Sequence, residues 1–214
     1  MLRHQDIQQD ETLGATSIRY LALGDSYTIG EGVAEGTGFP QQLAGRLQNA
    51  GFLPEVTIIA RTGWSANQLA EGIAENAPQG TYPLVTLLIG VNNQYRRMDA
   101  TEYRRELRDL IRQCIGFAGN DTRRVIVISI PDYSVTPFAA GMDTARIAGE
   151  IDAFNAIKKS ETQRTGVAFA DVTPVSRQVA GDLSLLASDG LHPSARMYGK
   201  WADLLFPMSN KILR

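Results

Sequence analysis

The most informative segment of this chain reads Ile18-Arg-Tyr-Leu-Ala-Leu23, and it runs directly into Gly24-Asp25-Ser26. Its first part is a short, nearly continuous apolar run, which is typical of a strand that is buried on both faces. Gly24 ends the run, as glycine commonly does at the edge of a strand. The segment therefore predicts a buried strand that leads into a polar loop carrying a serine.

Four more apolar runs follow, at residues 56–60, 84–89, 125–130 and 167–170, and Pro54 bounds the first of these upstream. Stretches with helical spacing lie between and after the runs, at residues 38–50, 66–76, 100–118, 144–164 and 194–206. Because strand and helix alternate and the strands lack polar faces, the pattern predicts a five-stranded parallel sheet with helices on both faces. The expected fold class is α/β with three layers.

The chain of 214 residues is 43% hydrophobic and 21% charged, an ordinary composition for a globular protein. No linker or internal repeat divides it, so we expect residues 16–214 to form one domain and the polar residues 1–15 to form a loose arm. The net charge of −2 lacks the basic excess that attracts phosphate backbones, so no nucleic acid partner is expected.

The sequence contains no apolar run long enough to span a bilayer, so stable membrane insertion is not expected. Residues 1–15 lack the apolar stretch of a secretory signal, which favours a cytoplasmic protein unless a leader has been removed. The sequence gives no indication of the oligomeric state.

The loops after the strands are where an open parallel sheet binds its ligands. Small and polar residues follow four of the predicted strands, in the segments Gly24-Asp25-Ser26, Arg61-Thr62-Gly63, Gly90-Val91-Asn92-Asn93 and Pro131-Asp132-Tyr133. We expect the hydroxyl of Ser26 to face this cleft, although a serine here is by itself more typical of a helix cap. Gly63 permits a close backbone approach and Asn92 offers an amide donor to an oxyanion, although each alone is more typical of a turn.

Histidine is the commonest carrier of protons near neutral pH, and this sequence has only two. His4 lies in the polar arm, whereas His192 lies in a polar loop before the last predicted helix. Asp189, three residues earlier, can approach the ring nitrogen that faces away from a substrate and can fix the tautomer of the ring. Taken alone, Asp189 and His192 are equally consistent with a turn before Pro193.

Four segments, taken in order, resemble the sequence blocks of the SGNH hydrolases, also called GDSL esterases and lipases. They are Gly24-Asp25-Ser26, the loop of Gly63, Gly90-Val91-Asn92-Asn93 and Asp189-Gly-Leu-His192. The resemblance spans nearly the whole chain and implies a flavodoxin-like sheet. It also implies Ser26 as the nucleophile, with His192 and Asp189 completing a triad, and an oxyanion hole made by Ser26, Gly63 and Asn92.

Two positions depart from the pattern of the family. Tyr27 replaces the leucine of the GDSL name and leaves the nucleophile unchanged. Asn93 replaces an aspartate, which puts the usual hydrogen bonds of that loop in doubt but keeps the donor at Asn92.

The resemblance implies hydrolysis of esters or thioesters without a metal or other cofactor, through an acyl-enzyme on Ser26. Because no long apolar lid is evident, we expect small to medium acyl esters, such as those of carboxylesterases, lysophospholipases or thioesterases. Four aromatic residues in or near the strand-end loops are candidates for the acyl pocket, and they are equally consistent with local packing: Tyr27, Trp64, Tyr133 and Phe138.

Two other functions fit the same residues. An acyltransferase would use the same serine and pass the acyl group to an alcohol instead of water. A non-catalytic α/β module would bind an anion at the helix that begins after Gly24, although that loop lacks a glycine-rich phosphate fingerprint and a P-loop lysine. The absence of a Gly-x-Ser-x-Gly elbow disfavours an α/β-hydrolase.

Overall fold

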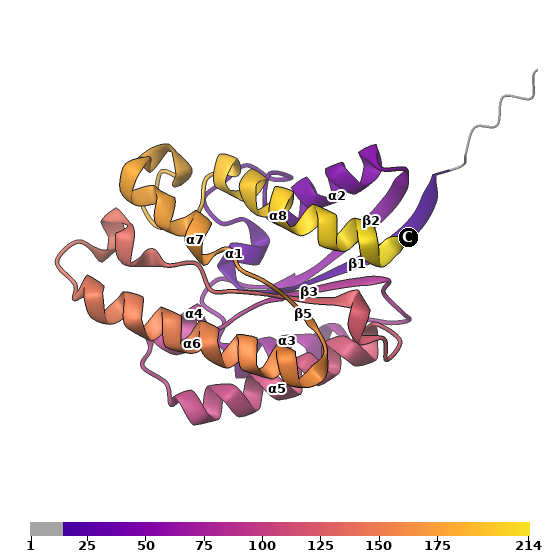
Figure 1. Cartoon of the computed structure of the whole chain (residues 1–214), viewed down its shortest axis with the longest axis horizontal. Helices are drawn as coiled ribbons and strands as arrows, with labels where there is room; N and C mark the ends of the chain where they lie inside the picture. The colour runs from indigo at the N-terminus through magenta and orange to yellow at the C-terminus, as the bar shows by residue number, and fades with distance from the viewer. Residues whose placement is uncertain (1–14) are drawn as a thin grey trace, which may run out of the picture.

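The structure, a computed structural model, describes residues 15–214, so His4 and the predicted arm, except for its last residue, lie outside the described residues. Its five strands form one parallel sheet in the order β2-β1-β3-β4-β5 (Figure 1). The strands are β1 (Thr16–Gly24), β2 (Phe52–Ala60), β3 (Leu84–Leu88), β4 (Val125–Ile128) and β5 (Ala168–Ala170). The predicted α/β fold is confirmed, and the strand order is that of flavodoxin-like sheets.

Five long helices form the outer layers of the molecule. They are α2 (Phe39–Asn49), α3 (Ala66–Asn76), α5 (Ala100–Phe117), α6 (Thr144–Thr165) and α8 (Ala195–Leu213). Helices α2 and α8 cover one face of the sheet, and α3, α5 and α6 cover the other (Figure 1). Short helical turns occupy the connections: α1 (Ser26–Ile29), α4 (Val91–Tyr95), α7 (Thr173–Ser176), η1 (Thr122–Arg124), η2 (Tyr133–Val135), η3 (Pro137–Ala139), η4 (Arg177–Gly181) and η5 (Leu183–Leu185).

Two prolines do not end their elements where the sequence pattern predicted. Strand β2 begins at Phe52 and continues through Pro54, which is tolerated because β2 is an edge strand with one side free of ladder hydrogen bonds. Helix α8 continues through Pro207 to Leu213 and does not end at residue 206. Apolar side chains beyond Pro207, including Met208 and Ile212, pack against the core and hold this last part of the helix in place.

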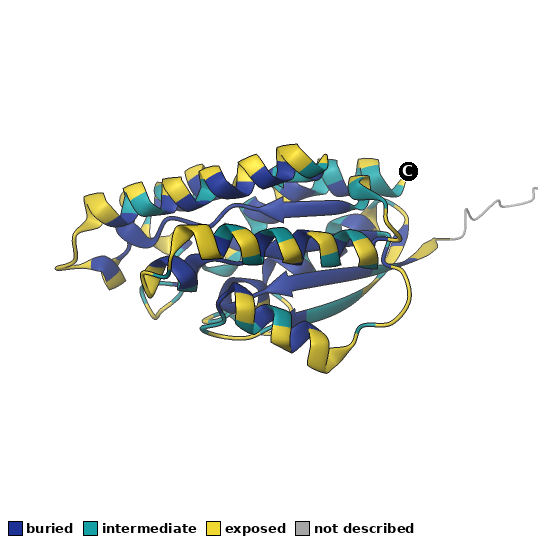
Figure 2. Ribbon diagram, turned by 90° about the horizontal axis from the view of Figure 1, so that it is seen from below, coloured by how far each residue is buried: buried dark blue, intermediate teal, exposed yellow. Residues whose placement is uncertain are grey.

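The middle of the sheet is fully buried between the two helical layers (Figure 2). Every side chain of β3 and β4 is buried, as the unbroken apolar runs predicted. The register pairs Gly24 with Ala60 on one side and with Leu88 on the other, so β1, β2 and β3 end at the same level. The loops that follow these strands therefore meet at one edge of the sheet. No helix within residues 15–214 is both long and apolar enough to cross a membrane.

Candidate active site

Ser26 is placed at the carboxyl edge of the sheet by a sharp passage from β1 into α1. Gly24 ends the strand, and a Cβ atom added to it would lie only 2.3 Å from the carbonyl oxygen of Leu88, so a larger residue does not fit. Asp25 caps α1 by accepting a hydrogen bond from the backbone N–H of Tyr27 at 3.1 Å. Ser26 then begins the helix, so its own N–H has no partner within the helix.

His192 lies in the loop between η5 and α8, and this loop is held by backbone hydrogen bonds. The carbonyl oxygen of His192 accepts a hydrogen bond from the N–H of Ala187 at 2.8 Å, and Ser194 caps α8 directly afterwards. Asp189 Oδ1 accepts the N–H groups of Leu191 and His192, both at 2.9 Å. The spacing of three residues thus closes a tight turn that brings the carboxylate to the imidazole.

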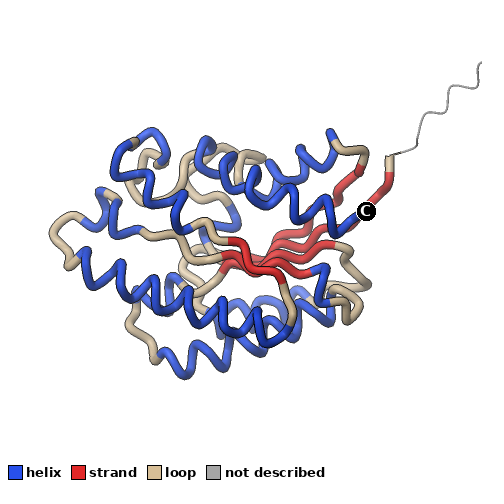
Figure 3. The backbone as a smooth tube through the Cα atoms, viewed as in Figure 1, coloured by secondary structure: helices blue, strands red, loops and turns tan. Residues whose placement is uncertain are grey.

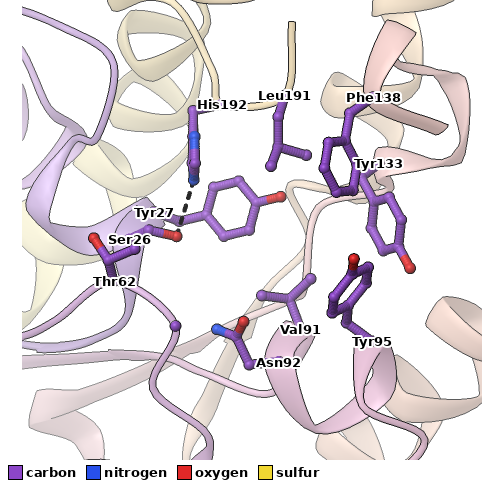
Figure 4. A pocket seen from close by; sticks show the side chains of 11 residues that line it. Ser26, Tyr27, Thr62, Val91, Asn92, Tyr95, Tyr133, Phe138, Leu191 and His192 are labelled. Atoms are coloured by element: carbon purple, nitrogen blue, oxygen red, sulfur yellow. Dashed lines mark hydrogen bonds between the residues drawn. The ribbon is translucent and has the colours of Figure 1, made fainter. Parts of the chain in front are cut away.

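The three side chains form one continuous chain of hydrogen bonds. Asp189 Oδ2 lies 2.7 Å from His192 Nδ1. His192 Nε2 lies 3.0 Å from Ser26 Oγ, and Figure 4 marks this second contact with a dashed line. Ser26 and His192 are 166 positions apart in the sequence, yet both are buried at the same edge of the sheet. This is the arrangement in which an imidazole can take a proton from a serine hydroxyl while a carboxylate fixes its tautomer.

The environment of Asp189 keeps its carboxylate ionised. Partial burial acts to raise the pKa of Asp189, but the hydrogen bonds from the His192 ring and from two backbone N–H groups outweigh it and hold the pKa below its ordinary value. A carboxylate in this state can stabilise a positive imidazole throughout the neutral range.

Two further ionisable groups are buried beside the loop that carries Ser26. Asp25 and Lys158 of α6 are both fully buried, and Lys158 Nζ donates to the carbonyl oxygen of Ile128 at 2.6 Å. Burial raises the pKa of Asp25 and lowers the pKa of Lys158, while the attraction between their opposite charges opposes both shifts. This mutual attraction offsets part of the cost of burying a carboxyl group at the cap of α1.

Gly63 and Asn92 lie at the same cavity as Ser26, in the loops after β2 and β3. Gly63 has a φ of +80°, a left-handed conformation that favours glycine, and its carbonyl oxygen accepts a hydrogen bond from Arg96 at 2.7 Å. Asn92 Nδ2 donates one hydrogen to the carbonyl oxygen of Trp64 at 3.0 Å. The amide of Asn92 points into the cavity on the side of Ser26, where its second hydrogen can reach a bound oxygen (Figure 4).

Asn93, which replaces the aspartate of the family pattern, still supplies a hydrogen-bond acceptor to the neighbouring loop. It is fully buried, and its Oδ1 accepts the backbone N–H of Ala66 at the start of α3, at 2.9 Å. Its Nδ2 donates to Glu106 of α5 at 3.2 Å. The amide therefore ties α4 to two helices, and the loop that carries Asn92 keeps its support.

The cavity beside Ser26 has a volume of about 170 Å³. It is lined by Ser26, Tyr27, Thr62, Gly63, Val91, Asn92, Tyr95, Tyr133, Phe138, Leu191 and His192. The ring of Tyr27 lies across the middle of the view in Figure 4, between Leu191 and Val91. Tyr95, Tyr133 and Phe138, which we call the aromatic trio, enclose the end away from Ser26, and their ring centroids are 6.0 to 6.2 Å apart.

Three of the four aromatic residues that the sequence suggested for the pocket line this cavity, and Trp64 does not. The indole of Trp64 packs against Gly72 of α3 instead, so closely that a Cβ added to Gly72 would lie 2.1 Å from the ring. Four further residues that line the cavity were not predicted from the sequence: Thr62, Val91, Tyr95 and Leu191. Three of them are neighbours of residues that were singled out, whereas Tyr95 ends α4, a helix too short for the pattern to reveal.

Residues 22–200 match the model of the GDSL-like Lipase/Acylhydrolase family. No curated protein sequence matches the chain.

Many solved structures share the fold of this chain. A putative GDSL-like lipase from Parabacteroides merdae has a TM-score of 0.74 at 16% identity, with 91% of this chain and 96% of that chain covered. Axe2, an acetylxylan esterase from Geobacillus stearothermophilus, has a TM-score of 0.70 at 20% identity, with coverage of 92% and 96%. The psychrotrophic esterase EstA from Pseudoalteromonas sp., in a structure inhibited by monoethylphosphonate, has a TM-score of 0.68 at 15% identity, with coverage of 91% and 98%.

Proposed function

We propose that this chain, which belongs to the GDSL-like lipase/acylhydrolase family and therefore acts on ester bonds, hydrolyses small to medium acyl esters through Ser26, His192 and Asp189. The observation that carries the proposal is the unbroken hydrogen-bond chain from Asp189 Oδ2 through the imidazole to Ser26 Oγ, with steps of 2.7 and 3.0 Å. The hydrolase domain of this proposal spans residues 16–214.

The reaction begins when His192 Nε2 takes the hydroxyl proton of Ser26 and Oγ attacks the ester carbonyl. The carbonyl oxygen becomes an oxyanion that accepts hydrogen bonds from the backbone N–H groups of Ser26 and Gly63 and from Asn92 Nδ2. The imidazolium then protonates the alcohol oxygen as its bond to carbon breaks, which leaves an acyl-enzyme on Ser26. Water repeats the same steps and releases the acid, while Asp189 stabilises the charged imidazole in each half of the cycle.

The acyl group of this substrate occupies the apolar side of the cavity. Val91 and Leu191 flank it, and the ring of Tyr27 lies between them. Beyond the aromatic trio lies a more polar groove that includes Arg97 and Arg146. An acyl chain long enough to pass the trio would place methylene groups beside these charges, which favours short and medium chains.

A fluorophosphonate probe tests the nucleophile directly. We expect mass spectrometry to locate the adduct on Ser26, and we expect Ser26→Ala to abolish both labelling and hydrolysis of nitrophenyl esters. Ser160→Ala, which changes an exposed serine of α6, is the matched control and should keep both properties. An adduct on any other residue would contradict the mechanism, and product analysis with added glycerol separates hydrolysis from acyl transfer.

A further inference from the structure

A second carboxylate lies beside His192, on the side of the ring away from Asp189. Glu31 Oε2 is 4.0 Å from His192 Nε2, the nitrogen that faces Ser26, whereas Asp189 binds Nδ1. The triad and the oxyanion hole leave this carboxylate without a part in the reaction. Its place at the reacting nitrogen nevertheless brings it within reach of any group bound to that nitrogen.

Glu31 is held in this place by hydrogen bonds to two separate parts of the site, and its neighbour Gly32 lies close to a third. Its backbone N–H donates to the carbonyl oxygen of Ser26 at 3.1 Å, and Thr62 Oγ1 donates to its Oε2. The next residue, Gly32, has a φ of +81°, and a Cβ added there would lie 3.1 Å from Asp189 Oδ2. The segment of Glu31 and Gly32 is therefore pressed against the loop of Asp189, and the side chain of Glu31 is about one-third exposed (35%).

The site is consequently divided into an apolar side and a polar side. Thr62 lies beside Ser26 at the end of the cavity opposite the aromatic trio (Figure 4). An ester bound with its acyl group toward the trio places its alcohol part toward Thr62 and Glu31. The alcohol oxygen must also lie within hydrogen-bond distance of His192 Nε2, because that nitrogen returns the proton to it. The carbon that bears the ester oxygen is bonded to a second carbon of the alcohol. A substituent on this second carbon then comes within reach of the carboxylate of Glu31.

We propose that Glu31, held by Thr62, forms the subsite for the alcohol part of the ester and selects alcohols that carry a hydroxyl or an ammonium group on the carbon adjacent to the one that bears the ester oxygen. An ionised carboxylate accepts hydrogen bonds and donates none, and it attracts a positive or partly positive neighbour. Monoesters of polyols and esters of amino alcohols share this chemistry, whereas alcohols that carry an anion are repelled. The inference rests on the proposed esterase function and adds the class of alcohol to it.

Pairs of butyrate esters test the subsite because the acyl group stays the same. Glycerol monobutyrate is compared with propyl butyrate for the hydroxyl, and butyrylcholine with 3,3-dimethylbutyl butyrate for the positive charge. We expect the unmodified enzyme to have a higher kcat/KM for the first member of at least one pair than for the second. We expect Glu31→Gln to lower this ratio of kcat/KM values, first member over second, about tenfold. Thr62→Val should lower the same ratio by a smaller factor, because Glu31 loses its hydrogen-bond donor.

Glu35→Gln is the matched control, since Glu35 is an exposed carboxylate of the same loop, and it should leave both ratios unchanged. A ratio measured within one variant does not depend on the fraction of folded enzyme. If Ser26 is labelled and the esters are hydrolysed, but Glu31→Gln slows both members of each pair equally, the alcohol subsite is overturned and the esterase function stands. If neither labelling nor hydrolysis occurs, the proposed function itself fails.

Discussion

In the proposed mechanism, the side-chain amide of Asn92 makes two hydrogen bonds with different purposes. One hydrogen of Nδ2 goes to the carbonyl oxygen of Trp64, which fixes the side chain, and the other is directed to the cavity beside Ser26. A donor that is held in place before the reaction loses little entropy when the oxyanion forms. The next residue, Asn93, is fully buried and faces α3 and α5. Two adjacent asparagines therefore have different tasks, and only their burial and partners distinguish them.

We expect Asn92→Ala to lower kcat for a nitrophenyl ester by about 10²- to 10³-fold, because one donor to the oxyanion is lost in the transition state. KM should change little, since the substrate carbonyl carries less charge than the oxyanion. Steady-state kinetics measure both constants, and thermal unfolding checks the fold. Asn49→Ala, at an exposed position of α2, is the control. A kcat within about twofold of the unmodified enzyme would remove Asn92 from the proposed oxyanion hole.

Helices α5 and α6 are joined by a cluster of charges around Glu161. This carboxylate is buried on α6 and accepts hydrogen bonds from Arg104 and Arg108 of α5, at 3.0 to 3.1 Å, and from Arg164 of its own helix at 3.1 Å. The hydrogen bonds from Arg108, together with those from the other two arginines, outweigh the effect of burial and lower the pKa of Glu161 to about 2.

We expect Glu161→Gln to lower the free energy of unfolding by about 2 kcal/mol at pH 7, because charge-assisted hydrogen bonds between the two helices are lost. The pKa is depressed in the folded state, so the contribution of Glu161 is complete above its unfolded pKa of about 4.3 and is lost as the pH falls toward about 2. Urea denaturation should therefore give a smaller difference at about pH 3 than at pH 7.

The control for this experiment is Glu102→Gln, whose carboxylate is half-exposed and pairs with the exposed Arg105 on the same helix. Exposed pairs of this kind contribute about 0.5 kcal/mol or less. Two outcomes would show that the cluster does not stabilise the packing of α5 on α6. One is an equal loss of unfolding free energy in Glu161→Gln and Glu102→Gln, and the other is a difference between Glu161→Gln and the unmodified protein that grows as the pH falls.

At the scale of the whole molecule, the cavity is assembled from parts that meet only in the folded chain. The aromatic trio comes from three elements, α4, η2 and η3, and Leu191 enters from the loop before α8. In Figure 3 strand β1 begins at the right, so the carboxyl ends of all five parallel strands lie at the left, where these loops gather. The size of the cavity therefore depends on how several loops pack together.

We expect Tyr95→Ala to shift acyl preference toward longer chains, because it removes one ring of the trio that closes the apolar side of the cavity. The ratio of kcat/KM for nitrophenyl octanoate to that for nitrophenyl butyrate should rise about tenfold. Tyr95 is half-exposed, so its loss should cost little stability. Leu183→Ala, which changes an exposed apolar side chain that does not line the cavity, should leave the ratio unchanged. A ratio that falls in Tyr95→Ala would contradict this account of the trio.

Local patterns were sufficient for the architecture and for the positions of the chemical groups along it. An unbroken apolar run indicates a strand that is buried on both faces. When such strands alternate with helices along the chain, the pattern predicts a parallel sheet with helices on both faces. The long helices were predicted to within one residue, except at the end of α8. Ser26, Gly63 and Asn92 could be assigned to one edge of the sheet because parallel strands end there together, and Asp189 could be paired with His192 because three residues separate them.

The residues that line the cavity and the approach of Glu31 to His192 depend on the packing of distant segments. This packing could not be predicted, because it leaves no periodic pattern in the sequence. Trp64 does not line the cavity, because its ring packs closely against Gly72 of α3. Tyr95 does line the cavity, because it lies at the end of a helix of a single turn. The approach of Glu31 to His192 depends on a glycine with positive φ and on a threonine from another loop. Such contacts join residues far apart in the chain through the exact shape of loops, and only the folded molecule defines that shape.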